Sequence, residues 1–161
     1  MPKILIACIA GLFFFAGCVQ DMELLEKGNR DAEKKVLIAG TQSEFKQKVI
    51  EKVMEKLGSK DYYFKIIGLD RLKAEETGPY GAIILVNAFM AGQLDGRVKE
   101  FLQQDPTNPK AIVFYTIGDE NSTPPDWAKP DIRVDAVTSA SILERVGQRA
   151  DELVAIIKNK F

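Results

Sequence analysis

The most constraining feature of the sequence is a regular alternation of short apolar runs and amphipathic helical patterns between residues 35 and 158. Five runs rich in β-branched and apolar residues predict strands at Lys35–Ala39, Tyr62–Gly68, Gly81–Val86, Lys110–Ile117 and Asp131–Val134. The third run is apolar on both faces, which is typical of a central strand in a parallel sheet. Chains that alternate strands with helices fold into a parallel sheet covered by helices, so the sequence predicts an α/β domain.

The segments between the strands indicate the helices and the connections. A four-residue apolar repeat after the first strand predicts a helix that ends at Gly58. A second helix is expected around Val98, and a long closing helix from about Ser139 to Lys158. The connection Leu69–Tyr80 has room for about two helical turns at most. Right-handed crossovers then favour a doubly wound three-layer sandwich with five parallel strands in the order 2-1-3-4-5.

The N-terminal residues are typical of an export signal rather than of a folded element. Lys3 supplies a positive charge, and Ile4–Ala16 is an unbroken run of apolar residues and glycine. Such a run suits a secretory signal and is short for a helix that crosses a bilayer. It leads into Phe15-Ala16-Gly17-Cys18, which resembles the lipobox of bacterial lipoproteins, with Phe15 where leucine is usual. The resemblance implies that residues 1–17 are a signal peptide and that Cys18 carries lipid such as palmitate; an ordinary signal peptide or an uncleaved anchor is the alternative.

A lipidated Cys18 would anchor the protein to a membrane of the bacterial cell envelope, on the periplasmic or extracytoplasmic face. Val19 stands where an aspartate is associated with inner-membrane retention, which favours the outer membrane in a cell that has one. Val19–Lys34 is polar and carries mixed charges, so we expect residues 18–34 to be a lipidated tether. The domain itself is then expected to span residues 35–161.

The composition excludes several kinds of site. The chain has no histidine, which removes the commonest general base, the usual catalytic triad and His-ligated metals. Of its two cysteines, Cys8 would leave with the signal peptide and Cys18 would carry lipid, so no thiol would remain for catalysis or metal binding. A net charge of −1 gives no electrostatic basis for binding nucleic acid. We therefore predict no catalytic constellation, no metal site and no nucleic-acid partner.

The middle of the chain resembles a known family. The segment Tyr80–Gln104, followed by KAIVFYTIGD, is similar to the flavodoxin-like domains, in which a strand leads into a loop against the flavin ring. A Gly-x-Leu-x-Gly-x-x-Lys-x-Phe helix follows that loop in the family. The matching residues here are Gly92, Leu94, Gly96, Lys99 and Phe101. The resemblance extends loosely over residues 35–161 and implies a flavodoxin-like fold, for which FMN is the usual cofactor.

The loop after the first strand is where flavin-binding members of that family wrap the phosphate of FMN. Their run Thr/Ser-x-Thr-Gly-x-Thr keeps two hydroxyls here, Thr41 and Ser43, whereas Glu44 replaces the glycine and Lys46 the last threonine. A side chain hinders close backbone approach, and a carboxylate repels a phosphate. The alternative is a capping box, in which Thr41 and Glu44 each satisfy the other's backbone N–H without any ligand. We favour the cap, which makes this a degenerate FMN phosphate loop.

Ligands of such sheets bind beyond the carboxyl ends of the strands, where the strand order reverses. This rule selects the loops Thr41–Phe45, Asn87–Gln93 and Thr116–Trp127. The candidate binding residues in them are Thr41, Gln42, Ser43, Asn87, Phe89, Asp119 and Trp127. Phe89 and Trp127 would stack on a flat ligand, and the alternative for Trp127 is packing as a lid on the core.

Two functional hypotheses remain open at this point. The first is an envelope lipoprotein whose flavodoxin-like domain serves binding or interaction, without FMN and without catalysis, with the membrane and an envelope protein as partners. The second is an FMN-dependent electron carrier or reductase that uses a degenerate flavin site. The altered phosphate loop and the lack of catalytic groups favour the first.

Overall fold

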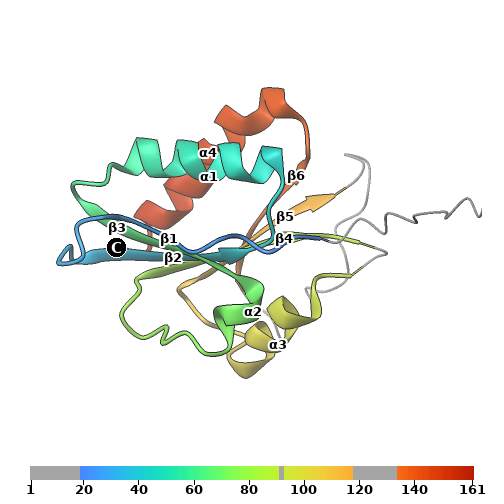
Figure 1. The fold of residues 1–161 in the computed structure, drawn as a ribbon, viewed down its shortest axis with the longest axis horizontal. Coiled ribbons are helices and arrows are strands. Elements are labelled where there is room, and N and C mark those ends of the chain that lie inside the picture. Colours follow the sequence, from blue (N-terminus) through green and yellow to red (C-terminus); the bar gives the residue numbers. More distant parts are fainter. Residues whose placement is uncertain (1–18, 91–92, 118–133) are drawn as a thin grey trace, which may run out of the picture.

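The computed structural model describes residues 19–90, 93–117 and 134–161, which form one sheet with helices on both faces (Figure 1). The sheet has six strands in the order β1-β3-β2-β4-β5-β6. The strands are β1 (Leu25–Gly28), β2 (Lys34–Gly40), β3 (Tyr62–Gly68), β4 (Ala82–Ala88), β5 (Ala111–Ile117) and β6 (Asp135–Ala140). Five of them, β3-β2-β4-β5-β6, pair in parallel and confirm the predicted order of the five parallel strands.

The prediction of a five-stranded sheet is wrong because β1 adds a sixth strand. It pairs antiparallel with β3, with Leu25 opposite Ile66 and Gly28 opposite Tyr63. All four residues of β1 are exposed, so the strand lacks the apolar alternation by which a strand is recognised. β1 lies inside the segment 18–34 that was expected to be a tether, and the described part of that segment is therefore held against the sheet rather than free of it.

The C-terminal part of the chain also differs from the prediction. The described strand that pairs with β5 is β6, Asp135–Ala140, whose residues are small, polar or weakly apolar. Val134, the last residue of the strand expected at Asp131–Val134, lies outside β6. Residues 131–133 lie outside the described part of the chain. The closing helix is consequently shorter than expected: a 3₁₀ turn, η1 (Leu143–Arg145), precedes α4 (Val146–Lys158).

Two helical layers enclose the sheet. Helices α1 (Glu44–Leu57) and α4 cover one face, and α2 (Leu69–Leu72) and α3 (Gly96–Gln104) cover the other (Figure 1). A hydrophobic core lies on each face of the sheet, and successive residues of β4 point to opposite faces. Ile84 packs in the core beneath α1 and α4, and Leu85 packs in the core beneath α2 and α3. The helix expected to end at Gly58 does so, with Gly58 at a φ of 81°.

No helix in the described ranges has both the length and the apolar character needed to cross a membrane.

The end of β1 gives a direct test of whether this segment is folded. Gly28 has a φ of 97°, and a Cβ built there would lie 2.1 Å from the carbonyl oxygen of Tyr62. We expect Gly28→Ala to lower the free energy of unfolding by at least about 1–2 kcal/mol, since alanine is strained in this backbone region and the clash adds to the strain. Denaturant unfolding followed by circular dichroism measures this loss.

The matched control is Gly78→Ala, because a Cβ at Gly78 meets nothing within 4 Å. We expect this control to change the free energy of unfolding by no more than about 0.5 kcal/mol. Equal stabilities for both variants would mean that β1 contributes nothing to the fold and that the segment is a tether after all.

Candidate functional site

The carboxyl ends of the parallel strands meet at one edge of the sheet, which lies to the right in Figure 1. Gly40 at the end of β2 pairs with Val86 of β4, and Ala88 of β4 pairs with Thr116 of β5. We call this the carboxyl edge. It is the edge at which the sequence rule placed the ligand site, between the ends of β2 and β4.

The N-terminal residues Val19–Met22, which we call the strap, run across the loop between β2 and α1. The backbone N–H of Gln42 donates to the carbonyl of Gln20 at 2.8 Å, and the N–H of Met22 donates to the carbonyl of Gly40 at 2.8 Å. Between these two bonds, Asp21 and Thr41 form an antiparallel bridge. The strap therefore occupies the Gln42 amide, one of the backbone groups of the expected phosphate loop.

Asp21 fixes the strap to the layer below the sheet. Its Oδ2 accepts from Nη1 of Arg97 at 2.6 Å and from the backbone N–H of Asp70 at 3.1 Å. Arg97 also donates to both carboxylate oxygens of Asp95, at 2.9 and 2.7 Å, which lowers the pKa of Asp95 and raises that of Arg97. One carboxylate of the strap thus joins the starts of α2 and α3.

Lys46 is the most unusual charged residue of the carboxyl edge. It is only 3% exposed, and its Nζ donates to Oγ1 of the fully buried Thr41 at 2.8 Å. None of the ion pairs formed among the described residues includes Lys46. Burial without a carboxylate partner disfavours the ammonium and lowers the pKa of Lys46 to about 8.

The predicted capping box of Thr41 and Glu44 is wrong. The N-cap of α1 is Ser43, whose Oγ accepts from the backbone N–H of Lys46 at 3.3 Å. Thr41 is buried below the strap and bonds the Lys46 ammonium instead. Glu44 points to solvent and pairs with Lys48 at 2.8 Å, one helical turn further along. Its carboxylate is therefore paired along the helix surface, and the backbone N–H of Thr41 donates to the carbonyl of Val86 instead.

A polar hollow of about 540 Å³ opens above this loop. Its walls include Gln20 of the strap, Ser43 and Lys46 of the loop and first turn, and Thr116 and Ser141 from the ends of β5 and β6. The charged groups of its lining are the Lys46 ammonium and the Glu44 carboxylate, the latter paired with Lys48. The hydroxyls and the ammonium suit a polar or anionic ligand.

Asn87 and Phe89 are not part of the lining of this hollow. Thr41, Gln42 and Ser43 lie together at the start of α1, whereas Phe89 packs into the α2–α3 layer with its ring against Tyr115, centroids 6.2 Å apart. Asn87 is 1% exposed, and its Oδ1 accepts from the N–H of Asp95 at 3.4 Å.

No partner for Nδ2 of Asn87 occurs among the described residues. Asp119 and Trp127 lie outside the described part of the chain, so their predicted roles stay predictions.

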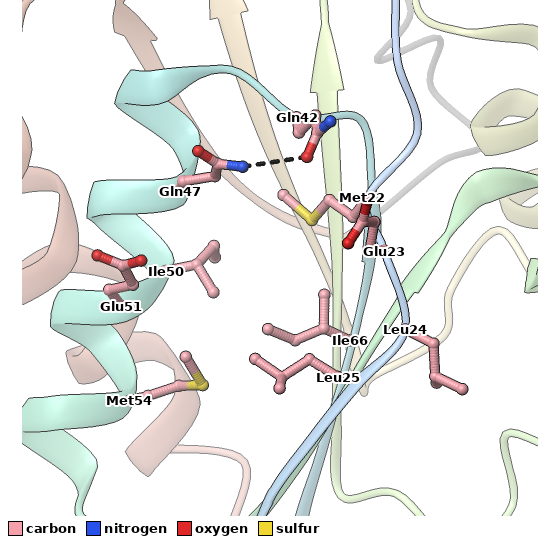
Figure 2. A pocket seen from close by; sticks show the side chains of 10 residues that line it. All are labelled: Met22, Glu23, Leu24, Leu25, Gln42, Gln47, Ile50, Glu51, Met54 and Ile66. Carbon is pink, nitrogen blue, oxygen red and sulfur yellow. Dashed lines mark hydrogen bonds between the residues drawn. The ribbon is translucent and has the colours of Figure 1, made fainter.

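A second hollow, of about 340 Å³, lies between the β1 side of the sheet and α1. Figure 2 shows Ile50 and Met54 of α1 facing Met22, Leu25 and Ile66 across it. A hydrogen bond of 3.0 Å between Gln47 and Gln42 lies at one end, and Glu23 and Glu51 add negative charge. We call this the β1–α1 groove. It exists because the strap and β1 are folded against the sheet.

Sequence reasoning missed Asp21, Arg97 and the burial of Lys46. The signal for Lys46 was present, because it lies three and four residues before Val49 and Ile50 on the apolar face of α1. A lysine in such a position is either solvent-exposed at a helix end or a buried functional group. Asp21 and Arg97 carried no comparable signal, since their contact joins residues 76 positions apart.

No protein-family model matches the chain, and no curated protein sequence matches it. Solved structures do resemble its fold. A flavodoxin from the Archaea superposes with a TM-score of 0.57 at 11% identity, covering 78% of this chain and 98% of that one. Flavodoxin 2 from Bacillus cereus gives 0.55 at 19% identity, covering 79% and 99%. The general stress protein 14 from Treponema denticola, solved in complex with FMN, gives 0.52 at 10% identity, covering 80% and 99%. The chain therefore has a flavodoxin-like fold.

The lowered pKa of Lys46 predicts a specific pH dependence of stability. The unfolded lysine keeps its proton up to about pH 10.5, whereas the folded one loses it near pH 8. Between these pH values the unfolded state binds more protons than the folded state, so the free energy of unfolding rises with pH, by up to about 3 kcal/mol. Below about pH 8 the folded protein bears the full cost of burying the charged ammonium. We expect Lys46→Met to remove this rise, as measured by urea unfolding at about pH 7 and about pH 10.

Lys48→Met is the control, because Lys48 lies on the same helix and is exposed in its pair with Glu44. Its stability gain between the two pH values should equal that of the unaltered protein. If the Lys46→Met variant also kept the full rise in the free energy of unfolding between the two pH values, burial would not lower the pKa of Lys46.

Proposed function

We propose that the protein is a lipoprotein of the bacterial cell envelope whose flavodoxin-like domain is a binding or interaction module that does not hold FMN. Residues 1–17 would be its signal peptide, and a lipid on Cys18 would anchor it to a membrane, with the outer membrane favoured where one exists. The apolar run Ile4–Ala16, followed by Ala16-Gly17-Cys18, supports the anchor. The observation that carries the loss of FMN is the strap across the β2–α1 loop.

The strap argues against FMN by competition for the same groups. A phosphate cradled by this loop would need backbone N–H groups, and the Gln42 N–H already donates to Gln20 at 2.8 Å. Val19 and Gln20 also form part of the wall of the 540 Å³ hollow. A phosphate that binds the Gln42 amide would have to displace Gln20 and break the backbone hydrogen bond between these two residues.

The alternative is an FMN-dependent electron carrier or reductase, and one observation favours it. The buried ammonium of Lys46, beside Thr41 and Ser43, would stabilise an anionic group at the start of α1. The fold is shared with flavodoxins and with a structure solved in complex with FMN. In the first proposal the strap keeps FMN out of the loop, and in the second the Lys46 ammonium binds the FMN phosphate there.

An envelope protein partner is part of the first proposal. The β1–α1 groove offers apolar surface from Met22, Ile50 and Met54 next to the carboxylates of Glu23 and Glu51. Such a groove suits a partner segment that combines an aliphatic side chain with a basic one. Methionine side chains adapt their shape to the side chain they receive.

Flavin uptake tests the proposal. We expect the chain from Val19 to Phe161, incubated with FMN and passed through a gel-filtration column, to elute without visible flavin absorbance. A matched chain that begins at Met22 lacks Gln20 and Asp21 and so frees the Gln42 amide. Uptake by the shortened chain alone would support the strap as the reason for the loss.

Co-elution of FMN with the longer chain would contradict the binding-module proposal and support the electron carrier. In that case Lys46→Met should weaken FMN binding by about 10- to 100-fold, because it removes a charge-assisted hydrogen bond worth about 1.5–3 kcal/mol. A Lys48→Met control should bind FMN as the unaltered chain does.

The anchor is tested separately. We expect the full chain, expressed in a bacterium fed an alkyne analogue of palmitate, to incorporate the label and to fractionate with membranes. Cys18→Ser should lose both, whereas Cys8→Ser should retain both, because only Cys18 follows the small residues Ala16 and Gly17. If the unaltered chain, which keeps Cys18, incorporated no label, the lipoprotein proposal would be overturned. That result would have no bearing on the fold.

A further inference from the structure

The position of Cys18 relative to the fold limits how a lipid-anchored domain can sit on a membrane. The carbonyl of Gln20 is hydrogen-bonded to the β2–α1 loop at 2.8 Å, so the chain is fixed two residues after Cys18. Two extended residues span at most about 7 Å. An anchor on Cys18 would therefore hold the carboxyl edge, and no other part of the domain, next to the lipid.

The same edge exposes an unusual share of apolar side chains. Val19, Met90, Ile142 and Leu143 are 44, 57, 39 and 43% exposed, and they come from the strap and from the segments after β4 and β6. Across the ranges that the structure describes, the other large apolar side chains with comparable exposure are Leu24, Leu25 and Phe161. The four therefore form the largest such group on one edge.

Val19 and Met90 lie beside the point where the chain enters the domain, and Ile142 and Leu143 follow the carboxyl end of β6. Val19 and Met90 line one hollow of about 240 Å³, together with Asn87 and Asp95. Val19 also lines the 540 Å³ hollow with Ser141, the residue before Ile142.

Among the described residues of this edge, Glu44 pairs with Lys48, and Asp21 and Asp95 pair with Arg97. The interaction that these described residues offer a lipid surface is therefore apolar contact.

We infer that the carboxyl edge is a membrane-contacting face, with Val19, Met90, Ile142 and Leu143 against the headgroup region of the bilayer that holds Cys18. The inference rests on the lipid anchor of the proposed function. It replaces a freely rotating domain on a tether by one with a fixed orientation. It also turns the two hollows of this edge toward the lipid, whereas the β1–α1 groove lies between β1 and α1 (Figure 2).

The test uses the chain from Cys18 to Phe161, which contains every described residue and has Cys18 as its one thiol. Its thiol is coupled to vesicles of phosphatidylcholine that carry a small fraction of maleimide lipid, so the result does not depend on lipidation in a cell. Trp127, the one tryptophan, is replaced by phenylalanine, and single Met90→Trp or Ser59→Trp reporters are introduced. Ser59 is exposed in the loop between α1 and β3, at the opposite edge.

We expect doxyl-labelled phosphatidylcholine to quench the Met90→Trp reporter several-fold more strongly than the Ser59→Trp reporter. Ile142→Trp is a second reporter at the same edge, for use if Met90→Trp fails to give a native circular dichroism spectrum. Adding Leu143→Asp to the reporter chain should reduce the quenching, because it removes an apolar contact and leaves the anchor in place. Equal quenching at both edges, or no effect of Leu143→Asp, would overturn the inference.

A failure of the cellular lipidation experiment would count against the anchor, and a failure of the vesicle experiment against the orientation. The two outcomes are therefore separable.

Discussion

The pairing of the strap with the β2–α1 loop is the interaction on which the carboxyl edge depends. Two backbone hydrogen bonds of 2.8 Å hold Gln20 and Met22 against Gln42 and Gly40. Thr41 is completely buried beneath them, and its hydroxyl accepts a hydrogen bond from the ammonium of Lys46. Met22 continues from the strap into the α1–α4 core and the wall of the β1–α1 groove. A segment whose composition is that of a linker thus forms part of the walls of the 540 Å³ hollow and of the β1–α1 groove.

The core of the fold was predictable from the sequence, whereas its edges were not. β3 was predicted to the residue, and β2, β4 and β5 to within two residues at either end, because their runs are apolar on both faces. The residues of β1 are exposed and those of β6 are only partly buried, so neither strand has a clear alternation of apolar and polar residues. β1 is paired on one side, and its sequence LEKG resembles any exposed turn. Such strands are specified by the neighbour that they pair with, which a local pattern does not contain.

The candidate site divides in the same way. Thr41, Gln42 and Ser43 lie at the carboxyl edge, because a loop after a parallel strand has to lie there, and their role in ligand binding stays a prediction. The role of Glu44 was wrong, since the choice between facing the loop and facing solvent depends on where the helix starts. Ser43 rather than Thr41 caps α1, which turns Glu44 outward to Lys48 and Lys46 inward to Thr41. A shift of two residues in the cap exchanges an acidic loop for a basic one.

Because Lys46 rather than Glu44 contacts Thr41, a different interaction decides whether the loop can bind the phosphate of FMN. The pair with Lys48 offsets part of the repulsion between the Glu44 carboxylate and a phosphate in the loop, and Lys46 would attract a phosphate. What opposes a phosphate is occupancy, because the Gln42 amide is bound to Gln20. A ligand that reaches this amide has to displace Gln20, which is two residues from Cys18. If Cys18 carries the proposed lipid, displacing Gln20 would lengthen the free chain between the anchor and the domain. Ligand binding at the loop and a domain held close to the membrane would then disfavour each other by linkage.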